Sequence, residues 1–223
     1  MKAVSSLPSR LYVICDADVC ERAGWTLVDV ASACLDGGAR FLQVRAKHAG
    51  SGRLLEWTTA IVERARTADA VVVLNDRADI ARIAGAAGVH VGQEDLSPTL
   101  VRLVAGARAL VGLSTHTMVH VEAALSEPID YLAVGPVFGT RTKTTGYDAV
   151  GLAQVERAVA RACRARPEAD RSTALPVVAI GGITLERAPA VIRAGAASVA
   201  VISDLLSTGD PAARVKQFLK ALQ

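Results

Sequence analysis

Eight short apolar runs recur along the chain, separated by segments rich in alanine, arginine and glutamate. Each run is four or five residues long and lacks the alternation of apolar and polar positions that a half-exposed strand shows. Continuous apolar runs of this length are typical of parallel strands buried on both faces of a sheet. We therefore predict buried strands at Leu11–Cys15, Phe41–Val44, Val71–Leu74, Gly88–Val91, Leu110–Leu113, Tyr131–Val134, Val177–Ile180 and Ser198–Ile202.

The segments between these runs have helical periodicity or a helix-forming composition, and they too number eight. The predicted helices are Leu27–Leu35, Gly52–Ala68, Ala78–Ala84, Thr99–Ala105, Met118–Leu125, Leu152–Arg166, Leu185–Ala194 and Pro211–Ala221. Strict alternation of eight strands and eight helices is the element order of a (β/α)8 barrel. We predict a single TIM-barrel domain over residues 1–223, and a doubly wound open sheet remains as the alternative.

Composition supports this class and narrows the partners. A hydrophobic fraction of 51% with 4% aromatic residues suits short strands covered by alanine-rich helices. The net charge of +3 comes from scattered residues rather than from a basic run, so we expect no nucleic-acid partner. No apolar run approaches the length of a membrane helix and Met1–Arg10 lacks a signal-peptide core, so we expect a cytoplasmic protein without a membrane partner. The oligomeric state, a homo-oligomer included, stays open.

The four cysteines, Cys15, Cys20, Cys34 and Cys163, show neither CxxC spacing nor clustering with histidines. This spacing gives no support to a zinc site or a redox motif. We expect all four to be reduced packing residues.

Three polar side chains alternate with apolar ones at the end of the second predicted strand. Gln43, Arg45 and Lys47 are spaced two residues apart, so they project to one face of the strand. In a barrel that face is the interior or its rim, and active sites of this architecture lie at the carboxyl ends of the strands. A cation there is costly unless an anion meets it, which favours donors directed at a phosphate group. The alternative is that acidic residues on neighbouring strands pair with the cations.

Asp76 and Asp95 lie nineteen residues apart, which is one strand-and-helix unit. In a parallel barrel they follow neighbouring strands, roughly 4.8 Å apart, and two carboxylates that close repel unless a cation lies between them. Mg²⁺ would suit such a pair, with waters and substrate phosphates completing its coordination. Alternatively, Asp76 pairs with Arg77 or caps the helix that starts at Ala78.

Three places after the last predicted strands could bind an anion. The run that ends at Gly135-Pro136 opens into Thr140, Arg141, Thr142 and Lys143, which offer two hydroxyls and two cations within four residues. Gly181-Gly182 and Ile202-Ser203 stand where many barrels bind phosphate through backbone N–H groups and helix N-termini. The alternatives are a solvated surface turn for the basic loop and a tight turn with positive φ for the glycines.

Two histidines and one serine raise the question of nucleophilic catalysis. His90 lies inside an apolar run and is interpreted as a barrel histidine with its hydrogen bonds satisfied rather than as a base. His116 lies close to Ser114, but no strand–turn–helix elbow surrounds Ser114. We therefore set a nucleophilic serine aside.

Seven segments together resemble the thiamine phosphate synthase family. In family order they are QVRAK at Gln43–Lys47, NDR at Asn75–Arg77, GVHVGQEDL at Gly88–Leu96, GLSTHT at Gly112–Thr117, DYLAVGPVFGTRTK at Asp130–Lys143, VVAIGGI at Val177–Ile183 and VAVIS at Val199–Ser203. The resemblance implies a TIM barrel that joins 4-amino-2-methyl-5-hydroxymethylpyrimidine diphosphate to a thiazole monophosphate. The products would be thiamine phosphate and pyrophosphate, formed in a dissociative substitution assisted by Mg²⁺.

The resemblance also implies roles for individual residues. The pyrimidine diphosphate would be held by Gln43, Arg45, Lys47, Asn75, Ser114 and Lys143, of which Arg45, Lys47, Ser114 and Lys143 would be catalytic. Mg²⁺ would be held by Asp76 and Asp95. The thiazole phosphate would be held by Thr140, Arg141, Thr142, Gly182, Ile202 and Ser203.

Two rival functions and two departures accompany the resemblance. A related thiazole tautomerase shares the barrel but would place a histidine where this chain has Pro136. A non-catalytic phosphate sensor would not need both Asp76 and Asp95. Gly139 and Arg141 replace commoner residues of the basic loop, and an expanded tract, Arg164–Ser172, is expected at the opposite end of the barrel.

Overall fold

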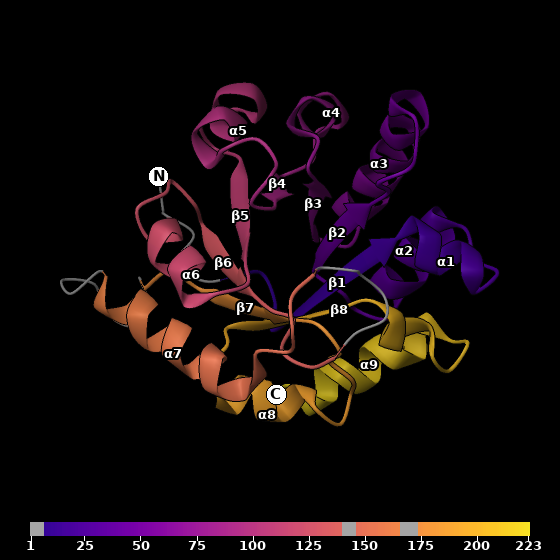
Figure 1. Cartoon of the computed structure of the whole chain (residues 1–223). Helices are drawn as coiled ribbons and strands as arrows, with labels where there is room; N and C mark the ends of the chain where they lie inside the picture. The colour runs from indigo at the N-terminus through magenta and orange to yellow at the C-terminus, as the bar shows by residue number, and fades with distance from the viewer. Residues whose placement is uncertain (1–6, 140–145, 166–173) are drawn as a thin grey trace.

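The computed structural model describes residues 7–139, 146–165 and 174–223. Eight parallel strands close into one barrel in sequence order, with β1 paired to β8 (Figure 1). The strands are β1 (Leu11–Asp16), β2 (Phe41–Arg45), β3 (Val71–Asn75), β4 (Gly88–Val91), β5 (Leu110–Thr115), β6 (Tyr131–Val134), β7 (Val177–Ile180) and β8 (Ser198–Val201). The predicted TIM barrel is confirmed, and a closed sheet excludes the doubly wound alternative.

Helices surround the barrel on its outside (Figure 1). They are α1 (Ala17–Arg22), α2 (Leu27–Asp36), α3 (Ser51–Arg66), α4 (Ala78–Ala84), α5 (Pro98–Ala105), α6 (Met118–Ala124), α7 (Gly151–Arg164), α8 (Ala188–Arg193) and α9 (Pro211–Ala221), with a 3₁₀ turn η1 (Ser203–Leu206). The eight predicted helices are all present among them. Within the described residues, no helix has the length and apolar character needed to cross a bilayer.

Two boundaries and one additional helix differ from the prediction for identifiable local reasons, and other ends differ by one or two residues. The helix expected at Leu185–Ala194 begins only at Ala188, because Pro189 has no N–H to donate and fits best in a first turn. The strand expected to include Ile202 ends at Val201, since Ile202 has a backbone conformation outside the β region and leads into η1. Helix α1 was missed; it is only six residues long, and Asp16 caps it by accepting from the Val19 N–H at 3.1 Å.

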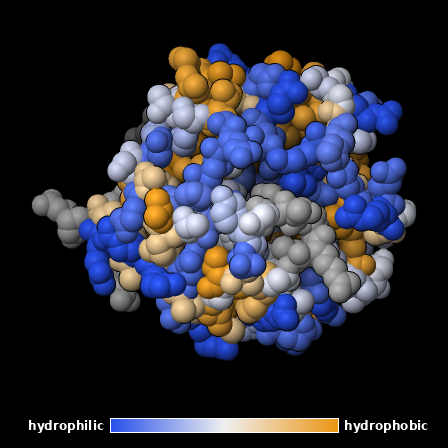
Figure 2. Space-filling view, in the orientation of Figure 1, coloured by the Kyte–Doolittle hydropathy of each residue, from blue (hydrophilic) through white to orange (hydrophobic). Residues whose placement is uncertain are grey.

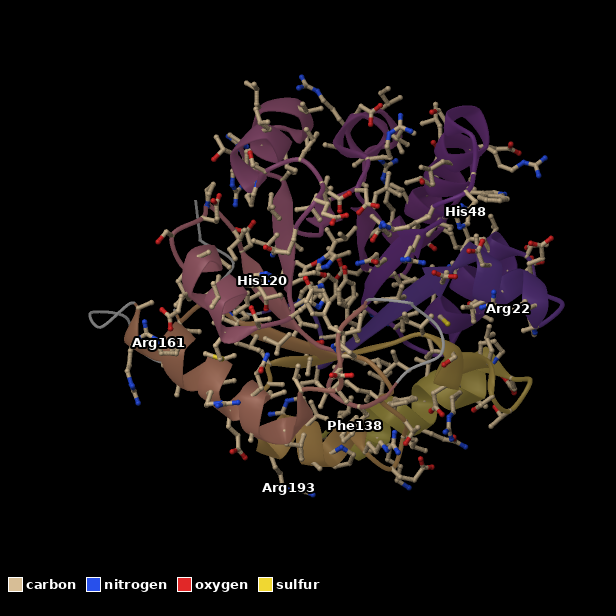
Figure 3. The ribbon with its side chains drawn as sticks, viewed as in Figure 1. Arg22, His48, His120, Phe138, Arg161 and Arg193 are labelled. Atoms are coloured by element: carbon tan, nitrogen blue, oxygen red, sulfur yellow. The ribbon has the colours of Figure 1, made fainter. Side chains whose placement is uncertain are left out.

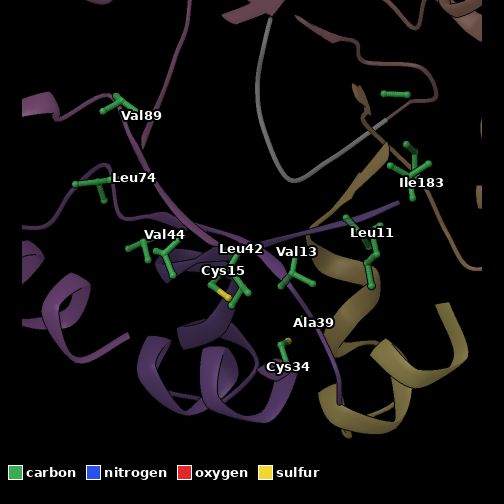
Figure 4. Close-up of a cluster of buried hydrophobic side chains, with 14 of the residues drawn as sticks. Leu11, Val13, Cys15, Cys34, Ala39, Leu42, Val44, Leu74, Val89 and Ile183 are labelled. Atoms are coloured by element: carbon green, nitrogen blue, oxygen red, sulfur yellow. The ribbon is translucent and has the colours of Figure 1, made fainter. Parts of the chain in front are cut away.

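Two separate hydrophobic cores follow from the alternation of side chains along each strand. Outward-facing residues such as Leu11, Val13 and Leu42 pack against the helices (Figure 4). Inward-facing residues fill the barrel, including Tyr12, Phe41 and Tyr131, whose rings contact one another. The inner core is therefore partly aromatic and carries polar hydroxyls toward the mouth of the barrel.

Three of the four cysteines confirm the packing prediction, and one does not. Cys15, Cys20 and Cys34 are free thiols buried between β1 and the first two helices. Burial and the neighbouring Asp16 carboxylate raise the pKa of the Cys20 thiol to about 12. Cys163 is exposed on α7, so its prediction as a packing residue was wrong. It lies at a position of α7 that faces solvent rather than the barrel.

Candidate active site

A cavity of about 270 Å³ opens at the carboxyl ends of the strands, where the prediction placed the site. Most of the predicted pyrimidine-binding and metal-binding residues line it: Gln43, Arg45, Lys47, Asn75, Asp76, Asp95 and Ser114. Lys143 lies outside the described residues. The structure thus gathers side chains from β2, β3, β4 and β5 and from the loops that follow them around one space.

Arg45, at the end of β2, and Lys47, just after it, are both paired with carboxylates, as the alternative interpretation of the sequence proposed. Arg45 forms a salt bridge with Asp16, the last residue of β1; their side chains are 13% and 3% exposed. Lys47 Nζ lies 3.4 Å from an Asp76 oxygen, and 41% of the Lys47 side chain is exposed. Both cations nevertheless line the cavity. The Arg45 pair is a buried part of the wall, whereas Lys47 stands at the rim.

Asp76 faces Asp95 across the same rim. Burial and the hydrogen bond and negative charge of Asp95 raise the pKa of the Asp76 carboxyl, and Lys47 partly opposes this rise. Asp95 is held from behind by the Gly92 N–H, which donates to it at 2.7 Å. A carboxylate whose pKa is raised by a second carboxylate beside it marks a place where a divalent cation would be favoured.

Asp76 neither pairs with Arg77 nor caps α4, the two alternative roles that its sequence position allowed. The N-cap of α4 is Arg77, and no side chain caps that helix. The Arg77 guanidinium donates to Asp79 at 2.7 and 3.0 Å and to Ser51 at 3.0 Å. Asp76 instead has a left-handed backbone with φ of 63°, and its N–H donates to the His90 carbonyl at 2.9 Å.

Hydrogen-bonded side chains form the floor of this cavity. Gln43 is 2% exposed and donates to the Tyr12 hydroxyl at 2.9 Å. His90 contacts the Ser114 hydroxyl at 2.8 Å through Nε2 and the Tyr131 hydroxyl at 3.0 Å through Nδ1. The interpretation of His90 as a histidine with satisfied hydrogen bonds is confirmed, and the histidine in contact with Ser114 is His90 rather than His116.

His116 closes another part of the wall. Its Nδ1 lies 2.6 Å from the Gly135 carbonyl oxygen, and its ring stacks on Tyr147 with centroids 4.3 Å apart. Both residues line the first cavity. Tyr147 follows the basic loop closely in sequence, and this stack holds it against the wall of the first cavity.

A second cavity, of about 750 Å³, lies beside the first, and about half of the residues that line it are glycine, alanine, serine or threonine. Gly182, Ile202 and Ser203 line it, as predicted for a phosphate site. Gly182 has φ of +61°, and a Cβ there would lie 2.5 Å from the Gly139 carbonyl oxygen. The loop residues assigned with them, Thr140, Arg141 and Thr142, lie outside the described residues, as does most of the tract Arg164–Ser172.

Two arginines beside this second cavity were not anticipated. Arg187 donates to the Gly182 carbonyl at 2.8 Å, and its guanidinium lies 4.7 Å from the ring of Phe138 (labelled in Figure 3). Arg22, at the end of α1 and labelled in Figure 3, also lines the cavity. Arg22 was not predicted to be at the site because α1 was not predicted, and Arg187 was not because it precedes a helix that starts later than expected.

Figure 2 shows the mouth of the barrel with a mostly hydrophilic rim, whereas a hydrophobic patch lies over α5, where Leu100 and Leu103 are exposed.

Comparison with known proteins assigns this geometry to a family. Residues 11–205 match the family described as thiamine monophosphate synthase. The chain belongs to the thiamine monophosphate synthase family. A thiamine-phosphate synthase of Koribacter versatilis is 44% identical over 215 residues, covering 96% of this chain and 95% of the relative. One of Anaeromyxobacter dehalogenans is 44% identical over 193 residues, covering 86% and 82%.

The solved structures agree with this membership. Thiamine phosphate pyrophosphorylase from Pyrococcus furiosus superposes with a TM-score of 0.81 at 28% identity, covering 96% of this chain and 95% of the other. The matched family region begins at β1 and ends within η1, so it includes every described residue that lines the two cavities except Leu206 and Ser207. The resemblance drawn from seven sequence segments is therefore confirmed at the level of the family.

Proposed function

We propose that this protein is a thiamine phosphate synthase, a transferase that moves a pyrimidinylmethyl group from its diphosphate to a thiazole monophosphate and releases pyrophosphate. Family membership supports this activity. The observation that carries it is the presence of two adjacent cavities that share Ala200 and Ile202 as a common wall. A reaction that joins two phosphorylated substrates needs two such sites with a common border, where the new bond forms.

The first cavity suits the pyrimidine diphosphate. Its floor presents neutral hydrogen-bonding groups, Gln43, Asn75 and Ser114, which fit a heterocycle, and its rim presents cations, which fit a diphosphate. Arg45 and Lys47 would stabilise the charge that develops on the departing pyrophosphate, and Lys143 of the basic loop would add a third cation. Ser114 would orient the pyrimidine ring.

Asp76 and Asp95 fit a Mg²⁺ ion. Within the described residues, no group of three or more His, Cys, Asp or Glu side chains is placed to hold a metal. Two adjacent carboxylates, one of which raises the pKa of the other, match the way Mg²⁺ is usually held, by one or two carboxylates with the rest supplied by waters and substrate phosphates. When bound, Mg²⁺ would neutralise charge on the pyrophosphate oxygens.

The second cavity suits the thiazole monophosphate. The left-handed backbone at Gly182 allows a close approach of a phosphate to main-chain N–H groups there and at Ile202 and Ser203. Thr140, Arg141 and Thr142 would complete the phosphate contacts from the neighbouring loop. The thiazole nitrogen would then lie toward the shared wall, facing the pyrimidine methylene carbon.

This assignment explains why the site is rich in cations and lacks a catalytic dyad. Departure of pyrophosphate before attack by the thiazole nitrogen requires charge stabilisation and placement rather than a strong base. The tautomerase alternative would need a base at the end of β6, where this chain has the buried Pro136. A homo-oligomeric state and a cytoplasmic location stay predictions.

Release of pyrophosphate by the purified protein tests the proposal. We expect release only when the pyrimidine diphosphate, the thiazole monophosphate and Mg²⁺ are all present, in equal amounts with thiamine phosphate. Binding of both substrates in the presence of Mg²⁺ without product would refute the synthase and favour the phosphate sensor. Interconversion of thiazole tautomers without condensation would favour the tautomerase.

A further inference from the structure

A continuous chain of hydrogen bonds runs beneath the first cavity from one side of the barrel to the other. Gln43 Nε2 donates to the Tyr12 hydroxyl at 2.9 Å, and the Tyr12 and Tyr131 hydroxyls are 3.0 Å apart. Tyr131 then contacts His90 Nδ1 at 3.0 Å, and His90 Nε2 contacts Ser114 Oγ at 2.8 Å. Gln43 and Ser114, the two ends, line the cavity, as do parts of Tyr12 and His90, whereas Tyr131 lies behind them. This series of hydrogen bonds connects two candidate pyrimidine contacts through the barrel interior.

The barrel makes specific room for this chain. Gly112 on β5 is paired in register with His90 on one side and Tyr131 on the other. A Cβ at Gly112 would lie 2.0 Å from Tyr131 Cζ, so the phenol lies over the strand where any other residue would place its side chain. All members are at most 8% exposed, which makes an unsatisfied hydrogen bond in the chain costly.

The direction of the protons along the chain follows from its first donor. Because Gln43 donates to Tyr12, the Tyr12 proton is satisfied only if it is donated to Tyr131. Tyr131 then donates to His90 Nδ1, which leaves the His90 proton on Nε2, where it is donated to Ser114. In the reverse direction Tyr12 would accept from both partners and its own proton would have no acceptor among them. Burial raises the pKa of both phenols, which keeps their protons in place.

We propose that Tyr12, Tyr131 and His90 are positioning residues that fix the hydrogen-bond polarity of the pyrimidine site. Ser114, which accepts from His90, is left to donate its own proton into the cavity. Gln43, whose NH₂ group is oriented by Tyr12, presents its carbonyl oxygen. A donor beside an acceptor matches an aminopyrimidine edge, with its ring nitrogen as acceptor and its amine as donor. The 4-oxo analogue has a donor and an acceptor in the opposite positions. The hydrogen-bond series therefore makes the site select 4-amino over 4-oxo pyrimidines.

The direction of these hydrogen bonds also distinguishes the His90–Ser114 pair from the serine–histidine dyad of a hydrolase. A base would need a free lone pair on the nitrogen next to Ser114, whereas here that nitrogen carries the proton. His90 therefore orients Ser114 without activating it as a nucleophile. The inference rests on the proposed function for the identity of the ring, but the polarity argument rests only on the described side chains.

Dissociation constants for the 4-amino and 4-oxo pyrimidine diphosphates test the proposal, measured by calorimetry on the whole protein with Mg²⁺ present. We expect the wild-type protein to prefer the amino compound by about a hundredfold, because a fixed polar site rejects the wrong pattern. Tyr131→Phe and Tyr12→Phe remove one hydroxyl each while keeping the ring, and they should lower this preference about tenfold. His90→Phe should lower it as well, and His90→Gln, which keeps an N–H near Ser114, should largely restore it.

Two controls separate polarity from general damage. Thr115→Val removes a buried hydroxyl from β5, the strand that carries Ser114. This hydroxyl donates to the Ala133 carbonyl at 2.9 Å, and Thr115 does not line the cavity. The variant should therefore leave the preference unchanged. Inorganic pyrophosphate should bind all variants equally, since it does not reach the ring contacts. If both tyrosine variants still bind the amino compound and keep the wild-type preference, the positioning role of the hydrogen-bond series is refuted, while the proposed function stands. Failure of the wild-type protein to bind either pyrimidine would instead refute the proposed function.

Discussion

The two cavities share a wall but are built from different materials. The first is lined by charged and hydrogen-bonding side chains, and much of its wall is a network of ion pairs and hydroxyls. About half of the residues that line the second are glycine, alanine, serine or threonine, and Arg22 and Arg187 line it as well. Each solution suits one kind of ligand: side chains can discriminate the edges of a ring, and exposed N–H groups can surround a phosphate.

The difference also determines where each cavity is sensitive to mutation. The first depends on charges whose removal leaves a partner unpaired, as in the Arg45–Asp16 pair. The second depends on backbone conformations that other residues rarely adopt, as at Gly182. Substitutions in the first cavity should therefore lower folding stability most. Substitutions in the second should lower ligand affinity and change folding stability less.

The largest effect is expected for Arg45→Ala. Asp16 is 3% exposed and would be left as a buried carboxylate without its guanidinium partner, so the free energy of unfolding should fall by about 3 kcal/mol at neutral pH. Arg64→Ala is the matched control, because it removes an Arg–Asp pair whose side chains are 39% and 61% exposed and should cost less than about 1 kcal/mol. Equal losses in urea denaturation would show that the pair in the first cavity is no more than a surface salt bridge.

A smaller effect, confined to the second cavity, is expected for Gly182→Ala. The added Cβ would lie 2.5 Å from the Gly139 carbonyl oxygen at a φ of +61°, so the backbone must shift and the approach of the phosphate is lost. We expect KM for the thiazole phosphate to rise about thirtyfold, which corresponds to about 2 kcal/mol, while KM for the pyrimidine diphosphate stays unchanged.

Gly209→Ala is the control for this substitution. It has a φ of +76°, but nothing lies within 4 Å of its added Cβ. It should share the backbone strain, about 1 kcal/mol, without the change in KM. A rise in KM for both substrates in Gly182→Ala would contradict the separation of the cavities.

The sequence predicted the barrel and the first cavity better than it predicted the contacts within them. Apolar runs specify strands buried on both faces, so β4 and β6 were placed without error. The partner of Ser114 could not be found in this way, because His116 is near it in sequence whereas His90 reaches it across the register of β4 and β5. Register between strands is a tertiary property, and so is the room that Gly112 gives Tyr131.

The second cavity was less predictable for a related reason. A pair of glycines is compatible with any tight turn, and only the closed barrel brings Gly182 beside Ile202 and Ser203. Arg187 was overlooked because its contact with the Gly182 carbonyl depends on the position at which α8 begins. A site that binds its ligand through backbone groups is therefore harder to predict from the sequence than one that binds through side chains.

Arg187→Ala should weaken the second cavity moderately. Its guanidinium donates to the Gly182 carbonyl at 2.8 Å and adds positive charge next to the phosphate position. We expect KM for the thiazole phosphate to rise about fivefold, or about 1 kcal/mol, with the increase shrinking at high ionic strength. Arg193→Ala, on the exposed end of α8 (Figure 3), is the control and should have no effect. An equal response of the two variants would exclude a local role for Arg187.

The smallest change in stability, and one of opposite sign, is expected for Asp76→Asn in the absence of Mg²⁺. Burial and Asp95 raise the Asp76 pKa above its ordinary 3.8, so the folded chain binds this proton more tightly than the unfolded chain. Stability from this group is therefore lost as pH rises from 3.8 through the raised pKa, and the cost is fully present above that pKa. Removing the charge should stabilise the free protein by less than about 1 kcal/mol.

Asp79→Asn supplies the opposite case on the neighbouring helix. Arg77 lowers the pKa of the Asp79 carboxyl, so this variant should lose stability at neutral pH and not at acid pH. Thermal unfolding of both variants between pH 4 and 8, with and without Mg²⁺, checks the pair of signs. Mg²⁺ should raise Tm of the wild-type protein and of Asp79→Asn but not of Asp76→Asn, which should also lose activity. A variant at Asp76 that is less stable than the wild type without Mg²⁺ would mean that Lys47 already offsets the repulsion, and the first cavity would then need no metal to hold its two carboxylates together.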